Sequence, residues 1–383
     1  MNRTTHGILT THSGALAHPL DLHEMIVAKE AGKPVDLEAL DMAVQRAVTE
    51  VVKRQVEVGI TVLNDGEESK PNYTNYIINR LNGFGGERIP SRSRSHEAQE
   101  FPEYFARRAG RTTSAGRVLA CTGPVSWKDF AAVEKDVENL KAATKGVKAE
   151  DVFMSSASPG QICTRMPNKY YPTDEAYLNA TADMMKREYD AIAKAGFLLQ
   201  ADCPELAMSR DNQFANLSIQ EFRKVVTHHI EVLNQATKDI SPDRMRIHVC
   251  WGRGEGPHTA DVQLKDIADL LVKVRPAGIG IVGANGRHEH EWKVWKDVKL
   301  PDGKALIPGI VDNTTNIVEH PESVAERIVR YSSVVGRENV VAGVDCGFGA
   351  SPTDQDCDPR VAWAKMRSLG EGAALATKEL WRR

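Results

Sequence analysis

Two cysteines and a histidine have the residue types and the spacing of a metal site. His248 and Cys250 are two residues apart in the run MRIHVCWG, so on an extended strand both side chains point to the same side. Cys346 has the corresponding place in the later run VVAGVDCGFG. Imidazole and thiolate are preferred zinc ligands, and three protein ligands leave the fourth tetrahedral position for water or substrate. These three residues therefore predict a catalytic zinc site.

A purely structural role is the alternative for the same residues. Free cysteine is among the most buried residue types, so Cys250 and Cys346 could simply fill the core, with His248 hydrogen-bonded beside them. All three, however, fall at the ends of predicted strands, and Gly347 follows Cys346 where the backbone has to make room for a site. This placement favours the metal site.

The elements that must position these residues follow a repeating pattern. Short apolar runs alternate with longer amphipathic stretches along nearly the whole chain, as in βαβ units around a parallel sheet. Eight such strands close a TIM barrel, in which residues at the carboxyl ends of the strands face the active site. The predicted fold is therefore an α/β protein with a (β/α)8 barrel. The expected strands are 8–14, 61–67, 117–125, 151–157, 197–203, 244–251, 278–284, 305–312 and 339–345.

One of these nine runs, 117–125, is surplus to a barrel and is assigned to an excursion. It follows an irregular stretch rich in Arg and Pro that begins near Phe84, and long irregular stretches inside a compact domain are usually functional. We predict a single catalytic barrel domain over residues 1–383. Within it, residues 84–128 form a lid-like insertion between the second and third barrel strands, at the active-site face.

Composition and charge narrow the class of partner. Hydrophobic residues make up 41% of the 383 residues and charged residues 26%, as in an ordinary globular protein. A net charge of -3 gives no basic field for nucleic acid or an anionic membrane. The chain start lacks the features of a signal peptide, no apolar run approaches a membrane span, and the six cysteines have no paired short spacings. We expect a cytoplasmic protein that acts on small molecules, with homo-oligomerisation left open.

Five short motifs carry a family resemblance. HVC and DCG, together with TTHSG near the start, DGE at 65–67 and LLQADCPE, resemble the catalytic half of cobalamin-independent methionine synthase, and the resemblance spans almost the whole chain. In particular, the chain is similar to the short stand-alone members of that superfamily. These include epoxyalkane:coenzyme M transferase, which has an H-x-C…C zinc motif. The resemblance implies a barrel shared with uroporphyrinogen decarboxylase and methionine synthase.

The resemblance also implies roles for individual residues. His248, Cys250 and Cys346 would bind zinc. Ser13 in TTHSG, Glu67 in DGE and Asp202 in QADCP would match residues that hold an amino-acid thiol substrate. Asp202 and Glu67 also suit a catalytic site physically, because an acid at a strand end can pair with a substrate ammonium in a water-poor cavity.

One departure from the family pattern concerns the fourth zinc ligand. Methionine synthases add a glutamate from the seventh strand, and the matching position in GIGIVGANGRHEHEW is Val282, which cannot coordinate a metal. The fourth position would then be open to water, or a carboxylate from elsewhere would fill it. The candidates are Glu255, Glu289 and Glu291.

The function implied by the resemblance is zinc-dependent transfer of a methyl or other alkyl group to a thiol. A metal lowers the pKa of a bound thiol and delivers thiolate at neutral pH for attack on an electrophilic carbon. The donor and acceptor could be 5-methyltetrahydrofolate and homocysteine, or an epoxide and coenzyme M. From other classes, a metal-free lyase like uroporphyrinogen decarboxylase and a non-catalytic zinc or thiol-binding protein remain as alternatives.

Three further histidines follow the predicted metal strands. His258 in GRGEGPH is a candidate acid–base group, because flanking glycines permit close approach to a ligand. In RHEHEW, His288 and His290 share one side if the segment is extended. A second metal site is one interpretation of this run, but we favour a role for both histidines in orienting ligands or contacting substrate.

Overall fold

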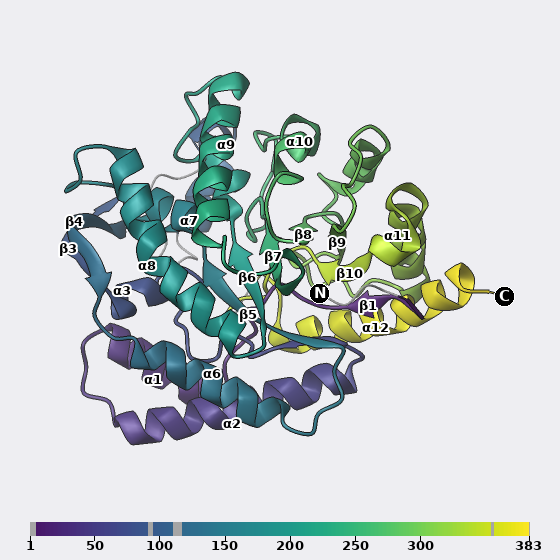
Figure 1. Ribbon diagram of the computed structural model, residues 1–383, viewed down its shortest axis with the longest axis horizontal. Helices are drawn as coiled ribbons and strands as arrows, with labels where there is room; N and C mark the ends of the chain where they lie inside the picture. The colour runs from purple at the N-terminus through teal and green to yellow at the C-terminus, as the bar shows by residue number, and fades with distance from the viewer. Residues whose placement is uncertain (1–4, 91–94, 110–116, 354–355, 383) are drawn as a thin grey trace.

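The computed structural model describes residues 5–90, 95–109, 117–353 and 356–382. Eight parallel strands form one sheet that curls into a nearly closed barrel with helices around it (Figure 1). The predicted (β/α)8 architecture is confirmed. In sheet order the strands are β1 (Leu9–Thr10), β10 (Val341–Val344), β9 (Ala305–Val311), β8 (Gly278–Ile281), β7 (Met245–His248), β6 (Leu198–Asp202), β5 (Asp151–Ala157) and β2 (Val62–Asn64).

Two threonines join the ends of this sheet. The backbone N–H of Thr61 donates to the carbonyl of Thr10 at 3.2 Å, and the N–H of Thr10 donates to Thr61 Oγ1 at 2.9 Å. These contacts lie between β1 and the start of β2, the two strands at the margins of the sheet order. They bring the first barrel strand, which leads to Ser13, beside the strand that leads to Glu67.

The helices correspond to the amphipathic stretches between the predicted strands. The longest are α2 (Leu37–Glu57), α8 (Asp174–Lys194), α9 (Ile219–Ala236) and α12 (Pro359–Leu380). Gly59 and Gly196, just beyond α2 and α8, have φ values of +86° and +90°, which only glycine adopts without strain. Both glycines lie between the end of a helix and the strand that follows. The other helices are α1 (Leu20–Glu30), α3 (Tyr76–Arg80), α6 (Ala131–Thr144), α7 (Pro159–Arg165), α10 (Ala268–Leu271) and α11 (Pro321–Val335).

Short 3-10 turns complete the loops at η1 (Pro204–Leu206), η2 (Met208–Asp211), η3 (Pro242–Arg244), η4 (Leu264–Asp266), η5 (Glu289–Lys296) and η6 (Arg337–Asn339). Two of them matter for the site. The η1 turn follows β6 directly, and η5 belongs to the segment after β8.

The chain between β2 and β5 makes the excursion expected from the surplus strand. Strands β3 (Leu81–Pro90) and β4 (Arg117–Trp127) pair antiparallel in a sheet of their own, at the margin of the molecule in Figure 1. Helices α4 (Ser95–Glu100) and α5 (Pro102–Ala109) lie between them in sequence. Residues 91–94 and 110–116 of the predicted 84–128 insertion lie outside the described residues.

The two helices of this excursion contact the loop that follows β7. Thr259 Oγ1 donates to Glu100 of α4 at 3.0 Å, and the hydroxyl of Tyr104 in α5 donates to the carbonyl of Glu255 at 2.5 Å. The loop begins directly after His248 and Cys250. The excursion therefore reaches the end of the barrel where the candidate ligands lie.

A buried arginine crosslinks the interior of the barrel. Arg246 in β7 donates to Gln200 Oε1 of β6, to Thr11 Oγ1 and to the carbonyl of His12, each at 2.8 Å. Its guanidinium also lies 3.5 Å from the centre of the Phe153 ring. Burial lowers the pKa of Arg246 to about 9. Arg246 is two residues before His248 on the same strand, so these contacts form a polar layer directly beneath the candidate site.

No helix among the described residues is long and apolar enough to cross a membrane.

Candidate metal centre and thiol site

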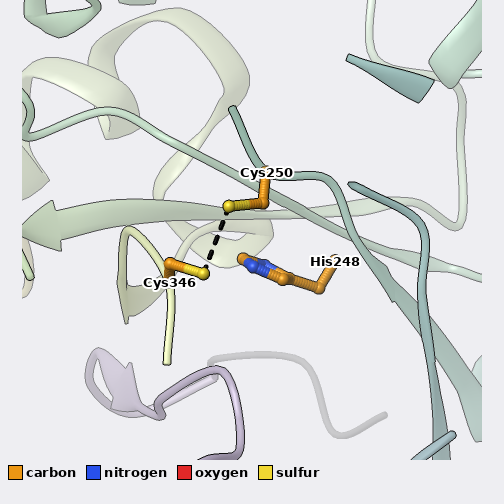
Figure 2. A group of neighbouring side chains, drawn as sticks. All are labelled: His248, Cys250 and Cys346. Atoms are coloured by element: carbon orange, nitrogen blue, oxygen red, sulfur yellow. Dashed lines mark hydrogen bonds between the residues drawn. The ribbon is translucent and has the colours of Figure 1, made fainter. Parts of the chain in front are cut away.

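The three predicted ligands converge at the carboxyl ends of two barrel strands. His248 is the last residue of β7, Cys250 follows it, and Cys346 follows β10. Figure 2 shows the three side chains pointing toward one another from these separate segments. The Sγ atoms of Cys250 and Cys346 are 3.1 Å apart, and the ligand atoms of all three residues lie within 4.8 Å of one another. This grouping matches the donor set of a zinc site.

The ring of His248 fits because its neighbour in the sheet has no side chain. Gly280 of β8 is the register partner of His248, and a Cβ there would lie 3.5 Å from Nδ1 and 3.0 Å from the carbonyl oxygen of Ile247. The imidazole is 7% exposed, and its Nε2 atom has no hydrogen-bond partner among the described residues. A buried ring nitrogen without a partner is what a metal ligand leaves when no ion is placed on it.

The two sulfurs differ in their readiness to lose a proton. The hydrogen bond from Cys250, helped by the nearby charge of His248, holds the pKa of Cys346 well below its usual range. The same hydrogen bond and burial raise the pKa of Cys250, whose sulfur also accepts the N–H of Gly252 at 3.1 Å. Although burial alone would lower the pKa of His248, contact with Cys346 raises it. Negative charge is thus favoured on the Cys346 sulfur, and a coordinated metal ion would deprotonate both thiols.

The fourth family ligand has no counterpart near these three residues. Val282 follows β8 directly, is buried and brings no donor atom. Within the described part of the chain, no carboxylate joins the His248, Cys250 and Cys346 group. Of the three acids suggested from sequence, Glu255 is exposed, Glu289 pairs with Arg327 and Arg330, and Glu291 bonds His288.

An aspartate not singled out from the sequence fixes the position of Cys346. The buried carboxylate of Asp345 accepts the backbone N–H groups of Gly283, Ala284 and Asn285 at 2.7, 2.9 and 2.6 Å. Burial, with the nearby charge of Asp312, raises its pKa to about 7. Its sequence signal was its place in VVAGVDCG, one residue before a predicted ligand at a strand end.

Glu67 lies close enough to Cys346 to interact with its charge, and one of its carboxylate oxygens has no partner among the described residues. It is 2% exposed and has a φ of +59°, a left-handed conformation that is rare outside glycine. Ser155 Oγ donates to its Oε1 at 2.6 Å, whereas Oε2 is buried with no hydrogen-bond partner among the residues described. Burial raises its pKa, while the nearby Lys70 ammonium opposes this shift and the Cys346 charge adds to it.

Asp202 is the register partner of His248 on the adjacent strand. Its Oδ1 accepts Gln200 Nε2 at 2.8 Å. Burial and the negative charge of Glu67 raise its pKa to about 7, whereas His248 opposes the rise. The two acids predicted to hold the substrate therefore interact with each other and with the candidate metal ligands.

Ser13 has a structural role in addition to its place beside the site. Its hydroxyl donates to the carbonyl of Val344 at 3.0 Å, and its own carbonyl accepts Gln200 Nε2 at 2.6 Å. The residue thus ties the turn after β1 to the end of β10 and to β6. Next to it, a Cβ at Gly14 would lie 2.5 Å from Glu67 Oε1, so the glycine leaves room for that carboxylate.

Tyr73 lies close to the two cysteines of the candidate site. Its hydroxyl accepts Gln161 Nε2 at 3.4 Å. Burial and then the charges of Cys250 and Cys346 raise its pKa, so the ring lies near both sulfurs. A phenol beside two cysteines could be recognised only once the loop after β2 was placed against the ligand strands.

The three further histidines do not form one group. His258 and His288 are buried and meet at Asp261, whereas His290 is exposed. RHEHEW is not extended: η5 begins at Glu289, so residues three apart share a face and His288 pairs with Glu291. The structure therefore separates His288 from His290, which the extended interpretation placed together.

Methionine synthases from two archaea match the chain along almost its whole length. The methionine synthase of Sulfolobus acidocaldarius is 23% identical over 374 residues, which is 97% of this chain and 93% of the relative. The methionine synthase of Thermococcus kodakarensis is 22% identical over 377 residues, or 97% and 94% of the two chains. No family model matches the sequence.

Solved structures agree on the fold. The B12-independent methionine synthase from Shewanella sp. W3-18-1, in complex with selenomethionine, superposes with a TM-score of 0.76 at 20% identity, over 98% of this chain and 99% of that chain. At this level of identity the likeness concerns the barrel itself.

Proposed function

Because the chain belongs to the family of cobalamin-independent methionine synthases, we propose that it transfers a methyl group to the sulfur of a small thiol, with homocysteine as the acceptor. The observation that carries the proposal is the convergence of Cys250, Cys346 and the unpartnered Nε2 of His248. These three residues would hold a zinc ion. Such an ion supplies thiol activation, since it lowers the pKa of a coordinated thiol and keeps the sulfur nucleophilic at neutral pH.

The protein's own residues would orient the amino-acid part of the acceptor. Glu67 and Asp202 are two buried acids, and the Oε2 atom of Glu67 has no partner within the described residues. A substrate ammonium between them would supply that missing hydrogen bond and relieve the repulsion between the two carboxylates. Charge-assisted hydrogen bonds of this kind are strong in a site without water.

Lys70 sets the charge balance beside these acids. Its Nζ atom is buried and donates to the Ser155 carbonyl at 2.6 Å. The Lys70 ammonium lowers the pKa values of both Glu67 and Asp202, against the effect of burial. We infer that Lys70 keeps enough negative charge on the pair to attract a substrate amine before it is bound.

The excursion between β2 and β5 would act as the cover of this site. Helices α4 and α5 contact the loop after Cys250 through Glu100 with Thr259 and through Tyr104 with Glu255. A cover here would exclude water while the nucleophilic sulfur attacks the methyl carbon. The methyl donor would enter between this cover and the barrel, and a methylated tetrahydrofolate is our proposed donor.

The test is methyl transfer from 5-methyltetrahydrofolate to homocysteine, followed as methionine formation by the zinc-supplemented protein. We expect activity in the parent protein and a loss of at least about 100-fold in Cys346→Ser, since removal of a metal ligand abolishes thiol activation. Cys163→Ser is the matched control, because Cys163 bonds Thr181 in another part of the chain and a serine can keep that contact.

Two outcomes would overturn the proposal. One is full activity of a Cys346→Ser protein that holds no metal. The other is a parent protein that binds zinc but methylates neither homocysteine nor a thiol that lacks the amine, such as 2-mercaptoethanesulfonate, with any methyl donor offered. Zinc content and thermal unfolding, measured on the same samples, together separate loss of the ion from loss of the fold.

A further inference from the structure

A second group of ligand-type side chains is buried beside the first centre. His258 and Asp261 belong to the loop that follows Cys250, and His288 precedes η5 in the segment after β8. Each of these side chains is only 4% exposed, and their ligand atoms lie within 4.8 Å of one another. The indole of Trp251, next to Cys250, lies 5.0 Å from the His288 ring. The group thus connects the loop after β7 with the segment after β8.

The outer nitrogen of each histidine is held by an acceptor. His258 Nε2 lies 3.2 Å from the carbonyl oxygen of Gly254, and His288 Nδ1 lies 2.8 Å from Glu291 Oε2. The other oxygen of Glu291 accepts the backbone N–H of Leu264 at 2.7 Å, which fixes the carboxylate. Because a carbonyl and a carboxylate only accept, both outer nitrogens carry their protons.

The inner nitrogens of the same two rings point at one oxygen. His258 Nδ1 is 2.6 Å and His288 Nε2 is 3.0 Å from Asp261 Oδ2. In a neutral imidazole with its outer nitrogen protonated, the inner nitrogen carries a lone pair. Three lone-pair atoms then face one another inside the protein, and a cation bound between them would be coordinated by all three.

Both histidine rings are held in the orientation that a metal ligand needs. The pattern of an outer nitrogen bonded to a carboxylate or carbonyl, with the inner nitrogen aimed at a common point, is how metal-binding histidines are oriented in proteins.

We propose that His258, Asp261 and His288 bind a divalent metal ion in a second site, separate from the cysteine centre, and that zinc is the best match. Two imidazoles and one carboxylate are ordinary zinc ligands, whereas calcium and magnesium prefer oxygen donors alone. The burial of the site assigns the ion a structural role. It would lock the loop that carries His258 against the segment before η5, and so hold Trp251 and Cys250 in place.

The experiment is metal analysis of the full-length protein after zinc saturation and removal of unbound ion. We expect two zinc ions per chain in the parent protein and one in His288→Ala. Cys250→Ser/Cys346→Ser should also keep one ion, and adding His288→Ala to it should remove that ion. His290→Ala is the matched control for metal content, since His290 lies two residues from His288 on the exposed side and should leave two ions bound.

Cobalt substitution distinguishes the two sites by their donors. In the Cys250→Ser/Cys346→Ser protein, bound cobalt should show visible d–d bands without the near-ultraviolet charge-transfer bands of sulfur ligands. Asp261→Asn provides a second variant if His288→Ala does not fold, as judged by its thermal unfolding. It keeps the shape of the side chain and should weaken cobalt binding by at least about tenfold.

One zinc per chain in the parent protein, unchanged in both His288→Ala and Asp261→Asn, would overturn the second site. So would the absence of metal from the saturated Cys250→Ser/Cys346→Ser protein. His258 and His288 would then be protonated and would form ion pairs with Asp261 and Glu291. Neither result would bear on methyl transfer at the cysteine centre, which is measured separately.

Discussion

Asp345 accepts the backbone N–H of Gly283 at 2.7 Å, and this contact joins the residue before Cys346 to the segment that follows Val282. Val282 itself offers no donor atom, but the residues after it hold Asp345 and so fix the position of Cys346, a candidate metal ligand on another strand. Since Asp345 also bonds Ala284 and Asn285, the end of β8 and the end of β10 form one unit. Perturbing that unit should therefore affect both stability and metal binding.

Gly309→Ala tests this unit. A Cβ at Gly309 would lie 1.8 Å from Asp345 Oδ1 and 2.7 Å from its Cα, so the aspartate would have to move. We expect a loss of about 3 kcal/mol or more in the free energy of unfolding, together with weaker zinc binding at the cysteine centre. Urea unfolding and zinc titration measure the two effects. Gly286→Ala is the control, because a Cβ there meets nothing within 4 Å and should change neither quantity.

Glu67→Gln tests recognition of the substrate amine. The amide keeps the size of the side chain and can still accept from Ser155 Oγ, but it removes the negative charge offered to an ammonium. We expect the KM for homocysteine to rise by about tenfold or more, since a charge-assisted hydrogen bond is replaced by a neutral one. With 4-mercaptobutanoate, which lacks the amine, KM should be unaffected. An equal rise for both thiols would show that Glu67 acts on the sulfur or on the fold instead.

Arg246→Met tests the polar layer beneath the site. The variant leaves three buried acceptors, in Gln200, Thr11 and His12, without their donor. We expect the free energy of unfolding to fall by about 3 kcal/mol or more, because each buried acceptor left without its donor costs roughly 1–3 kcal/mol. Arg244→Met, two residues earlier, removes an arginine whose side chain is 35% exposed and should lose about 1 kcal/mol or less. Similar losses in the two variants would contradict this account.

Glu205→Gln tests the pH dependence of stability. Burial raises the pKa of Glu205 from 4.5 to about 8, partly opposed by the hydrogen bond from Ser158. The folded protein therefore holds this proton up to about pH 8, whereas the unfolded chain releases it above 4.5. Between these values Glu205 should lower the free energy of unfolding as pH rises, by at most about 1.4 kcal/mol per pH unit.

The glutamine variant has no such proton to lose. The difference in melting temperature between pH 5 and pH 8 should accordingly be smaller in Glu205→Gln than in the parent protein. Parallel pH profiles would mean that the carboxyl is ionised in the folded state, against its burial. Glu221→Gln is the control, because Glu221 is fully exposed at the start of α9 and its pKa is lowered rather than raised.

The barrel strands and the candidate ligands were predictable because both depend on short-range patterns. Apolar runs that end in polar residues identified eight strands, and a spacing of two residues placed His248 and Cys250 on one side of β7. The surplus run at 117–125 was correctly kept out of the barrel, although its hairpin begins at Leu81 rather than Phe84. In each case a residue's role followed from its place along a single element.

The remaining features depend on loops and could not be predicted in this way. His258 has a φ of +55°, a conformation that sequence seldom signals outside glycine, and it meets Asp261 only because of that turn. His288 pairs with Glu291 because η5 has a period near three, whereas the extended interpretation used a period of two. The hydroxyl of Ser13 donates to the carbonyl of Val344, and this contact forms because barrel closure brings the turn after β1 beside the end of β10.

The most direct test of the central claim is the count of sulfur neighbours at zinc, measured by X-ray absorption at the zinc edge with and without homocysteine. If Cys250 and Cys346 hold the zinc ion that activates the thiol, the acceptor should add one sulfur per chain to the two from the protein. The Cys346→Ser protein should lose the protein sulfurs and the response together. A zinc environment without sulfur, or one that homocysteine leaves unchanged while the protein is turning over, would contradict the account.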